Sequence, residues 1–170
     1  MPRSFDMATE YDSTAEQVHR AFSDETYWLL RLGDSGSDHA TLDELVVGTD
    51  GGIRIRTTQT LGVHRLPAMV TQFHRGELSF VREETWSPMV NGRATATVVG
   101  KIPGAPAGLI GDAELAPATS RPGARMAVTA TVEVRVPLVG GKIETFIGGQ
   151  LVHLLRAERR FTTEWITENS

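Results

Sequence analysis

The sequence predicts an α+β fold in which one curved antiparallel sheet of six or seven strands wraps around a long C-terminal α-helix, with two short helices after the first strand. Three observations predict this fold. The segment from Gly140 to Ser170 carries an apolar residue every three or four positions and no proline, which is the spacing of one helix face. Asp50-Gly51 and Asn91-Gly92 are strong hairpin signals. The segments beside them alternate between apolar and polar residues, as half-buried strands do.

The first part of the chain is predicted to be a strand followed by two helices. A strand at 3–11 precedes a helix start at which Ser13 is the expected cap, and Glu16, three residues later, completes a capping box. Helical spacing resumes after residue 23 or 24 and ends at Gly33, before a loop rich in glycine, serine and aspartate.

The middle of the chain is predicted to be a series of antiparallel strands, because it alternates with period two between turn signals. A less regular stretch from Leu61 to Arg75 interrupts this series and contains a loop or short helical insert at 66–70. We expect the strands at 39–47, 52–59, 78–86, 93–101, 109–115 and 126–136.

The C-terminal helix is expected to run from about Gly141 to Glu168 and to be roughly 40 Å long at the usual rise per residue. Glu158 fills the one gap in its apolar face, which comprises Ile143, Ile147, Leu151, Leu154, Phe161 and Trp165. The side expected to face water carries Lys142, Glu144, Arg156, Arg159, Arg160 and Glu164. Gly148 and Gly149 each cost about 1 kcal/mol relative to alanine in a helix. The pair therefore indicates a bend or the close approach of another element.

Composition favours one domain covering residues 1–170. The 170 residues are 40% hydrophobic and 22% charged, an ordinary globular balance. The absence of cysteine excludes disulfides, thiolate catalysis and cysteine zinc sites. The net charge of −4 gives no electrostatic reason to expect a nucleic-acid partner or an anionic membrane. No apolar run is long enough for a signal peptide or membrane span, so we expect no integral membrane segment, a cytoplasmic location, and a monomer or weak homodimer.

The order strand, helix, helix, strands and long helix resembles the helix-grip fold of the START/SRPBCC superfamily, which has Bet v 1-like and polyketide cyclase-like members. The strand-to-helix junction, from Val136 to Glu144, reads VPLVGGKIE and resembles a group of actinobacterial proteins of uncharacterised function. The resemblance implies a cavity between sheet and helix that binds a hydrophobic or amphipathic small molecule. It supports the fold more than it supports any reaction.

Candidate ligand-binding residues follow from this layout. The inner side of the long helix contributes Ile147, Gln150, Leu151, Leu154 and Glu158. Strand alternation adds Phe80, Arg82, Glu84 and Trp86, and a cavity-facing carboxylate would need a partner such as Arg56. The alternative is that the apolar residues pack a core and the charged ones form cross-strand pairs on the surface or at a rim. Alternation assigns a shared face but does not say which face points inward.

No catalytic constellation is assembled in the sequence, so the catalytic residues are unassigned. The histidines have no HxH or HExxH spacing, so no metal site is expected; they are His19, His39, His64, His74 and His153. His64 or His74 is either a general base at a cavity mouth or a solvated loop histidine. GxSxG, phosphate-loop and dinucleotide motifs are absent, and no cofactor is expected.

These observations favour a carrier or sensor that binds a lipid-like or polyketide-like molecule over a catalyst. The alternative is a polyketide cyclase-like or aromatase-like enzyme acting on such a ligand. A third possibility is a protein-interaction module whose cavity is filled.

Overall fold

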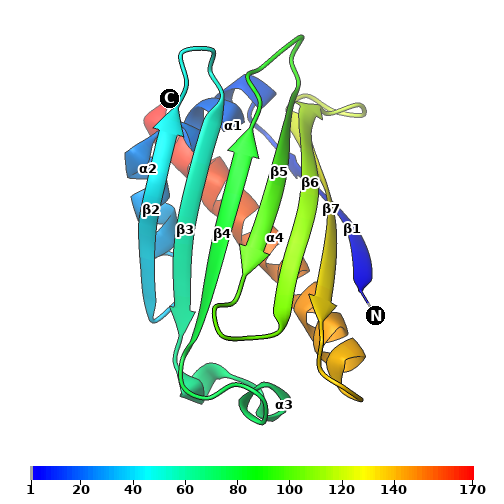
Figure 1. Cartoon of the computed structure of the whole chain (residues 1–170). Helices are drawn as coiled ribbons and strands as arrows, with labels where there is room; N and C mark the ends of the chain where they lie inside the picture. The colour runs from blue at the N-terminus through cyan, green and yellow to red at the C-terminus, as the bar shows by residue number, and fades with distance from the viewer. Residues whose placement is uncertain (1) are drawn as a thin grey trace.

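The computed structural model describes residues 2–170 and has the predicted α+β architecture, a seven-stranded antiparallel sheet with helices packed against one face (Figure 1). The strand order is β1-β7-β6-β5-β4-β3-β2. The strands are β1 (Arg3–Tyr11), β2 (His39–Val47), β3 (Ile53–Leu61), β4 (Leu78–Trp86), β5 (Ala94–Lys101), β6 (Ala107–Pro117) and β7 (Ala124–Val134). The predicted fold class is confirmed, and the ends of the predicted strands agree with the structure to within two residues.

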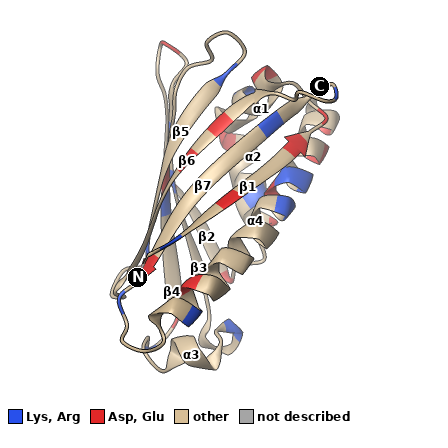
Figure 2. Ribbon diagram, turned by 90° about the vertical axis from the view of Figure 1, so that its right-hand side faces the viewer, with Lys and Arg blue, Asp and Glu red and all other residues tan. Residues whose placement is uncertain are grey.

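Three helices lie on the same face of the sheet. The short helices α1 (Ala15–Phe22) and α2 (Glu25–Gly33) cover its upper end, and the long helix α4 (Gly140–Asn169) crosses it obliquely (Figures 1 and 2). The irregular stretch between β3 and β4 forms the 3₁₀ helix η1 (Val63–Arg65) and the single-turn helix α3 (Ala68–Thr71) at the lower end of the sheet (Figure 1). None of the helices in residues 2–170 is both long and apolar enough to span a membrane.

The predicted cap of α1 is wrong by one residue. Thr14, not Ser13, is the N-cap: its hydroxyl accepts a hydrogen bond from Gln17 N (3.1 Å), and Gln17 Oε1 accepts one from Thr14 N (2.8 Å). Ser13–Glu16 and Thr14–Gln17 both fit the capping-box spacing, so local sequence does not distinguish them. The start of α2 agrees with the prediction, since Asp24 Oδ1 accepts from Thr26 N at 2.8 Å.

Two apolar cores lie between the helices and the sheet. The upper core is rich in aromatic residues and joins α1, α2 and the end of α4 to the sheet; its larger members include Phe22, Tyr27, Trp28, Trp86, Leu115 and Ile166. The lower core lies under the first half of α4 and comprises Leu109, Ala130, Val132, Val134 and Ile143. The cores are thus at opposite ends of the same helix.

The most buried line of α4 is rotated by about one residue from the predicted apolar face. Besides Ile143, the buried positions of this helix are Gly140, Glu144, Gly148, Thr162 and Ile166. The remaining apolar residues of the predicted face are only half-buried; these are Ile147, Leu151, Leu154, Phe161 and Trp165. Part of the apolar face of α4 therefore keeps accessible surface after the helix has packed, mainly on β1 and β7.

Glu144 explains part of this rotation and corrects its predicted place on the water-facing side. Its side chain is fully buried, and Oε2 accepts a hydrogen bond from Val134 N at 2.8 Å. A Cβ on Gly140 would collide with the carbonyl oxygen of the same Val134. The VPLVGGKIE junction thus fixes the start of α4 against the end of β7.

Candidate functional site

The structure determines which face of β4 points inward. Ile55 of β3 is buried in the upper core and lies opposite Glu84, while the buried Thr57 lies opposite Arg82. Side chains directly opposite each other in an antiparallel pair share a face. The even-numbered residues of β4 therefore face the helices, and these include the predicted site residues Phe80, Arg82, Glu84 and Trp86.

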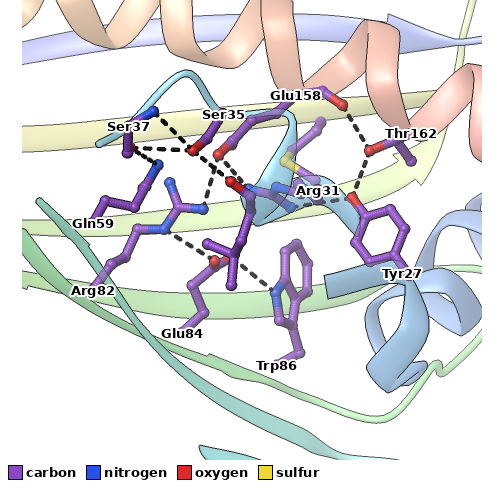
Figure 3. Close-up of polar contacts among 12 residues, drawn as sticks. Tyr27, Arg31, Ser35, Ser37, Gln59, Arg82, Glu84, Trp86, Glu158 and Thr162 are labelled. Atoms are coloured by element: carbon purple, nitrogen blue, oxygen red, sulfur yellow. Dashed lines mark hydrogen bonds and ion pairs between the residues drawn. The ribbon is translucent and has the colours of Figure 1, made fainter. Parts of the chain in front are cut away.

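Four charged side chains meet between the two cores and form what we call the ionic cluster: Arg31, Arg82, Glu84 and Glu158. Glu158 Oε2 lies 2.9 Å from Arg82 Nη2 and also pairs with Arg31 (Figure 3). Glu84 Oε2 lies 3.3 Å from Arg82 Nε, and its Oε1 accepts from the Trp86 indole N–H at 3.3 Å. The cluster therefore links α2, β4 and α4.

A second chain of hydrogen bonds holds Arg31 in place. Its Nη1 donates to the Tyr27 hydroxyl at 3.1 Å, and that hydroxyl lies 2.6 Å from Thr162 Oγ1 (Figure 3). The guanidinium carbon also lies 4.4 Å from the centre of the Trp28 ring, a cation–π distance. These contacts leave Arg31 with a fixed orientation toward Glu158.

The pKa shifts of Glu158 and Arg31 indicate that these two members of the cluster form an ionised pair at neutral pH. Burial acts to raise the pKa of Glu158, but attraction to Arg31 and Arg82 outweighs it and holds the pKa below its usual value. Burial acts to lower the pKa of Arg31, but the nearby Glu158 carboxylate raises it overall. With two guanidiniums and two carboxylates, the cluster carries no net charge. Removing one of these groups would leave an oppositely charged partner buried and uncompensated, which destabilises the folded state.

One buried donor in the cluster has no hydrogen-bond acceptor among residues 2–170. Arg82 Nε is buried, and Glu84 Oε2 at 3.3 Å is not aligned to accept from it. A buried unpaired N–H costs free energy that an aligned oxygen would recover. Within residues 2–170, Arg82 Nε is thus the one buried side-chain polar atom of the cluster that has no hydrogen-bond partner.

Apolar side chains with accessible surface lie immediately below the ionic cluster. Phe80 precedes Arg82 on the same face of β4, and Leu154 lies one helical turn before Glu158. Both side chains are half-buried, and neither belongs to either core. The Phe80 ring lies so close to Gly100 of β5 that a Cβ there would be 2.7 Å from it. Gly100 thus makes room for the ring on the inner face of the sheet.

Two predicted site residues lie away from this region. Arg56 points to the outer face of the sheet, where it pairs with Glu83 at 3.6 Å. Because side chains alternate along a strand, Arg56 is on the opposite face of the sheet from its buried neighbour Ile55. Gln150 is exposed because the rotation of α4 turns it toward water. The other predicted residues of α4 that face the sheet are Ile147, Leu151, Leu154 and Glu158.

Sequence reasoning missed Tyr27, Arg31 and Thr162. A usable signal is present on α2, where Tyr27 and Arg31 share one helix face and Trp28 lies beside them. The partner of Arg31, however, is 127 positions away along the chain, and no local pattern shows that pairing.

The histidines and the surface hollows lie elsewhere. His19 Nε2 lies 2.9 Å from Ser87 O, and His64 and His74 are in the β3–β4 connection. Within residues 2–170 no group of three or more His, Cys, Asp or Glu side chains is placed to hold a metal ion. One open hollow lies over the outer face of the sheet, where Asp6, Asp112 and Arg125 help to line it. Another lies between α2 and β2.

A protein-family model described as "Protein of unknown function (DUF2505)" matches residues 6–166. The chain belongs to the DUF2505 family. Its relatives include the uncharacterized protein Rv0481c of Mycobacterium tuberculosis H37Rv and the uncharacterized protein Mb0491c of Mycobacterium bovis. Each is 49% identical over 173 residues, covering 99% of both chains. The predicted resemblance to uncharacterised actinobacterial proteins is thereby confirmed.

Solved structures show the fold of this DUF2505 protein at low sequence identity. The Zhui aromatase/cyclase from a Streptomyces species has a TM-score of 0.60 at 8% identity, covering 98% of this chain and 94% of that one. Protein TTHA0849 from Thermus thermophilus has a TM-score of 0.58 at 16% identity, covering 99% of both chains. The Bet v 1-like protein Ara h 8.0201 has a TM-score of 0.53 at 9% identity, covering 96% and 99%. The helix-grip fold is confirmed.

Proposed function

We propose that this DUF2505 protein binds a small hydrophobic or amphipathic molecule between the sheet and α4, as a carrier or sensor. The observation that carries the proposal is the accessible apolar surface directly beside the ionic cluster. Apolar side chains that face inward but stay half-buried are available to a ligand, and a few placed polar groups beside them orient it.

The Arg82–Glu158 contact sets the geometry of this surface. Because Phe80 is two residues before Arg82 and Leu154 is four residues before Glu158, the 2.9 Å contact brings both apolar side chains to the same side of the cluster. Leu151 continues that side along α4 and packs against the lower core. A ligand's apolar body fits against these residues from β4 and α4.

The polar end of the ligand would meet Arg82. Its Nε is the buried donor that finds no acceptor in the described part of the chain, so a carbonyl, hydroxyl or carboxylate oxygen placed there would satisfy it without breaking the Glu158 contact. The apolar body and the single open donor together favour an amphipathic ligand with one oxygen-bearing end.

The lowered pKa of Glu158 favours a ligand-binding protein over the cyclase or aromatase alternative. A proton acceptor works best with a pKa near the working pH, whereas two guanidiniums hold the pKa of Glu158 below its usual value. Glu84 is also engaged, by Trp86 and Arg82. Glu158 is thus arranged to hold positive groups rather than to take up a proton.

Isothermal titration calorimetry with decanoic acid, decanol and 1-naphthol tests the proposal. We expect saturable binding of at least one of them with one site per chain. Phe80→Ala should weaken that binding roughly tenfold, the value of burying a large apolar side chain. Val81→Ala is the matched control, because Val81 is the half-buried neighbour on the other face of the same strand.

The proposal is overturned if none of the three compounds binds, or if Val81→Ala weakens binding as much as Phe80→Ala. Far-UV circular dichroism and urea unfolding of both variants show whether each remains folded. A second variant, Leu154→Trp, fills the same space from α4 and should also reduce binding while keeping an apolar side chain.

A further inference from the structure

Three connections gather at the lower end of the sheet, where β3, β5 and β7 finish. They are the β3–β4 connection at 62–77, the β5–β6 turn at 102–106 and the β7–α4 junction at 135–139. Because neighbouring strands in the sheet are antiparallel, every second strand finishes at the same end of the sheet. Figure 1 shows α3, the β5–β6 turn and the start of α4 at this lower end of the sheet. We call these three connections the lower rim.

Leu138 in the lower rim is both fully exposed and conformationally strained. Its side chain is 100% exposed, and its φ is +70°, a region that asparagine and glycine adopt more easily than leucine. The junction holds it there, because Val139 N donates to Pro137 O at 2.9 Å and Gly140 N donates to Val136 O at 3.0 Å. Neither packing nor backbone geometry accounts for leucine at this position. A contact outside the chain would.

The lower rim has two other exposed large apolar residues, and each is close to a cationic residue in the sequence. Val63 is 51% exposed and is two residues before Arg65; Phe73 is 50% exposed and is two residues before Arg75. Leu138 is itself four residues before Lys142. Each of these apolar residues is thus within four positions of a cationic residue along the chain, and together they come from two connections, 62–77 and 135–139.

The charge of the lower rim is opposite to that of the whole protein. The chain has a net charge of −4, yet its only two lysines, Lys101 and Lys142, are within three residues of rim segments in the sequence. Within residues 2–170, Lys101, Lys142 and Arg75 form no ion pair, while Arg65 is paired with Asp38 and Arg135 is paired with Glu133. Glu77 is the one acidic residue of the β3–β4 connection. The lower rim and its flanks therefore combine exposed apolar residues with cationic residues that form no ion pair within residues 2–170.

We propose that the lower rim docks on the surface of an anionic lipid bilayer. Leu138, Phe73 and Val63 would enter the boundary between headgroups and acyl chains, and the neighbouring cations would lie among the anionic headgroups. A bilayer fits better than a protein partner, because the three exposed apolar residues are spread over two connections and cationic residues accompany them. This docking needs no ligand in the inner site. The lower rim nevertheless contacts the lower core next to the inner site, because Met69 of α3 packs against that core.

Vesicle co-sedimentation of the full chain tests this proposal, with phosphatidylcholine vesicles and with vesicles containing one third phosphatidylglycerol. We expect binding to the anionic vesicles that falls as salt is raised. Leu138→Asn should weaken it roughly tenfold, because an apolar side chain no longer enters the bilayer. Lys142→Gln should weaken it about fivefold, the usual value of one cation near an anionic surface.

Two control variants make the result specific to the lower rim. Val90→Asn removes an exposed apolar residue from the β4–β5 turn at the opposite end, and Arg156→Gln removes an exposed cation from α4; both should bind as the parent does. Asparagine suits the backbone at position 138, so loss of folding does not explain a loss of binding there.

The proposal is overturned if anionic vesicles do not bind, or if Val90→Asn weakens binding as much as Leu138→Asn. A result in which Lys142→Gln acts and Leu138→Asn does not also overturn it, and points instead to an acidic protein surface. Calorimetry with decanoic acid uses no vesicles, so failure of docking and failure of the inner site are distinguished.

Discussion

At the scale of single residues, Glu158 matters most because it joins three elements. It belongs to α4, pairs with Arg31 of α2 and Arg82 of β4, and its carbonyl oxygen accepts from Thr162 Oγ1 at 2.7 Å. Removing one partner from a buried ion pair leaves the others uncompensated, which costs more than the pair itself contributes. The stability of the region between the two cores therefore depends on this carboxylate.

Glu158→Gln should lower the free energy of unfolding at pH 7 by about 3 kcal/mol, because two guanidiniums lose their anionic partner. The effect should shrink in acid. The pKa of Glu158 is lower in the folded state than its usual value of 4.5. Its contribution is therefore complete above that value and is lost as the pH falls through the lower, folded-state pKa. Urea unfolding at pH 7 and in steps below pH 4.5 measures both effects.

Glu164→Gln is the control for this experiment, since Glu164 is exposed on the same helix and forms no ion pair within residues 2–170. Its free energy of unfolding should stay within about 0.5 kcal/mol of the parent's. A difference between parent and Glu158→Gln that stays constant in acid would show that the ionised carboxylate is not the cause.

At the scale of elements, the two glycines of α4 have different roles. The close approach predicted for the pair is made at Gly148, where a Cβ would overlap the Phe5 ring of β1. Gly149 is exposed, and apart from its two chain neighbours and the adjoining helix backbone no atom of residues 2–170 lies within 4 Å of a Cβ built there. A methyl group at position 149 therefore meets no steric obstacle among residues 2–170. Only Gly148 is needed for α4 to pack on β1.

Gly149→Ala should raise the free energy of unfolding by up to about 1 kcal/mol, because alanine is the better helix former. Gly148→Ala should lower it, because the added methyl group displaces Phe5. Combining Gly148→Ala with Phe5→Ala should cost less than the sum of the single changes, as expected for residues in contact. Thermal and urea unfolding of these variants measure the effects. Equal responses at 148 and 149 would contradict the assignment.

Local sequence patterns were sufficient for the elements but not for the orientation of the site. Turn signals and alternation located the seven strands, and the apolar spacing located α4. The inward face of β4 depends on the β3–β4 register, which pairs Glu84 with Ile55. The rotation of α4 depends on Gly148 meeting Phe5, a contact 143 positions apart along the chain. Both are long-range contacts, so Arg56 and Gln150 were assigned to the site and Arg31 was missed.

At the scale of the whole molecule, one continuous sheet carries two cores with charged residues between them. The sheet runs without a break from β1 to β2, and α4 spans both cores. We therefore propose that residues 1–170 fold as one domain. The cores are unequal, however, because the upper one holds the aromatic cluster and the lower one is built largely from Ala, Val and Leu.

Hydrogen exchange followed by mass spectrometry should show this inequality along α4. The first half of the helix contains four glycines, and Ile147 and Leu151 there are only half-buried. In the second half, Thr162 and Ile166 are buried against the upper core and its short helices. Local opening is easiest where apolar contacts are fewest, so residues 142–151 should exchange faster than residues 158–166. A ligand held against Phe80 and Leu154 should slow exchange in the first half most. Uniform exchange along α4, or slower exchange in its first half without ligand, would contradict this account of the two cores.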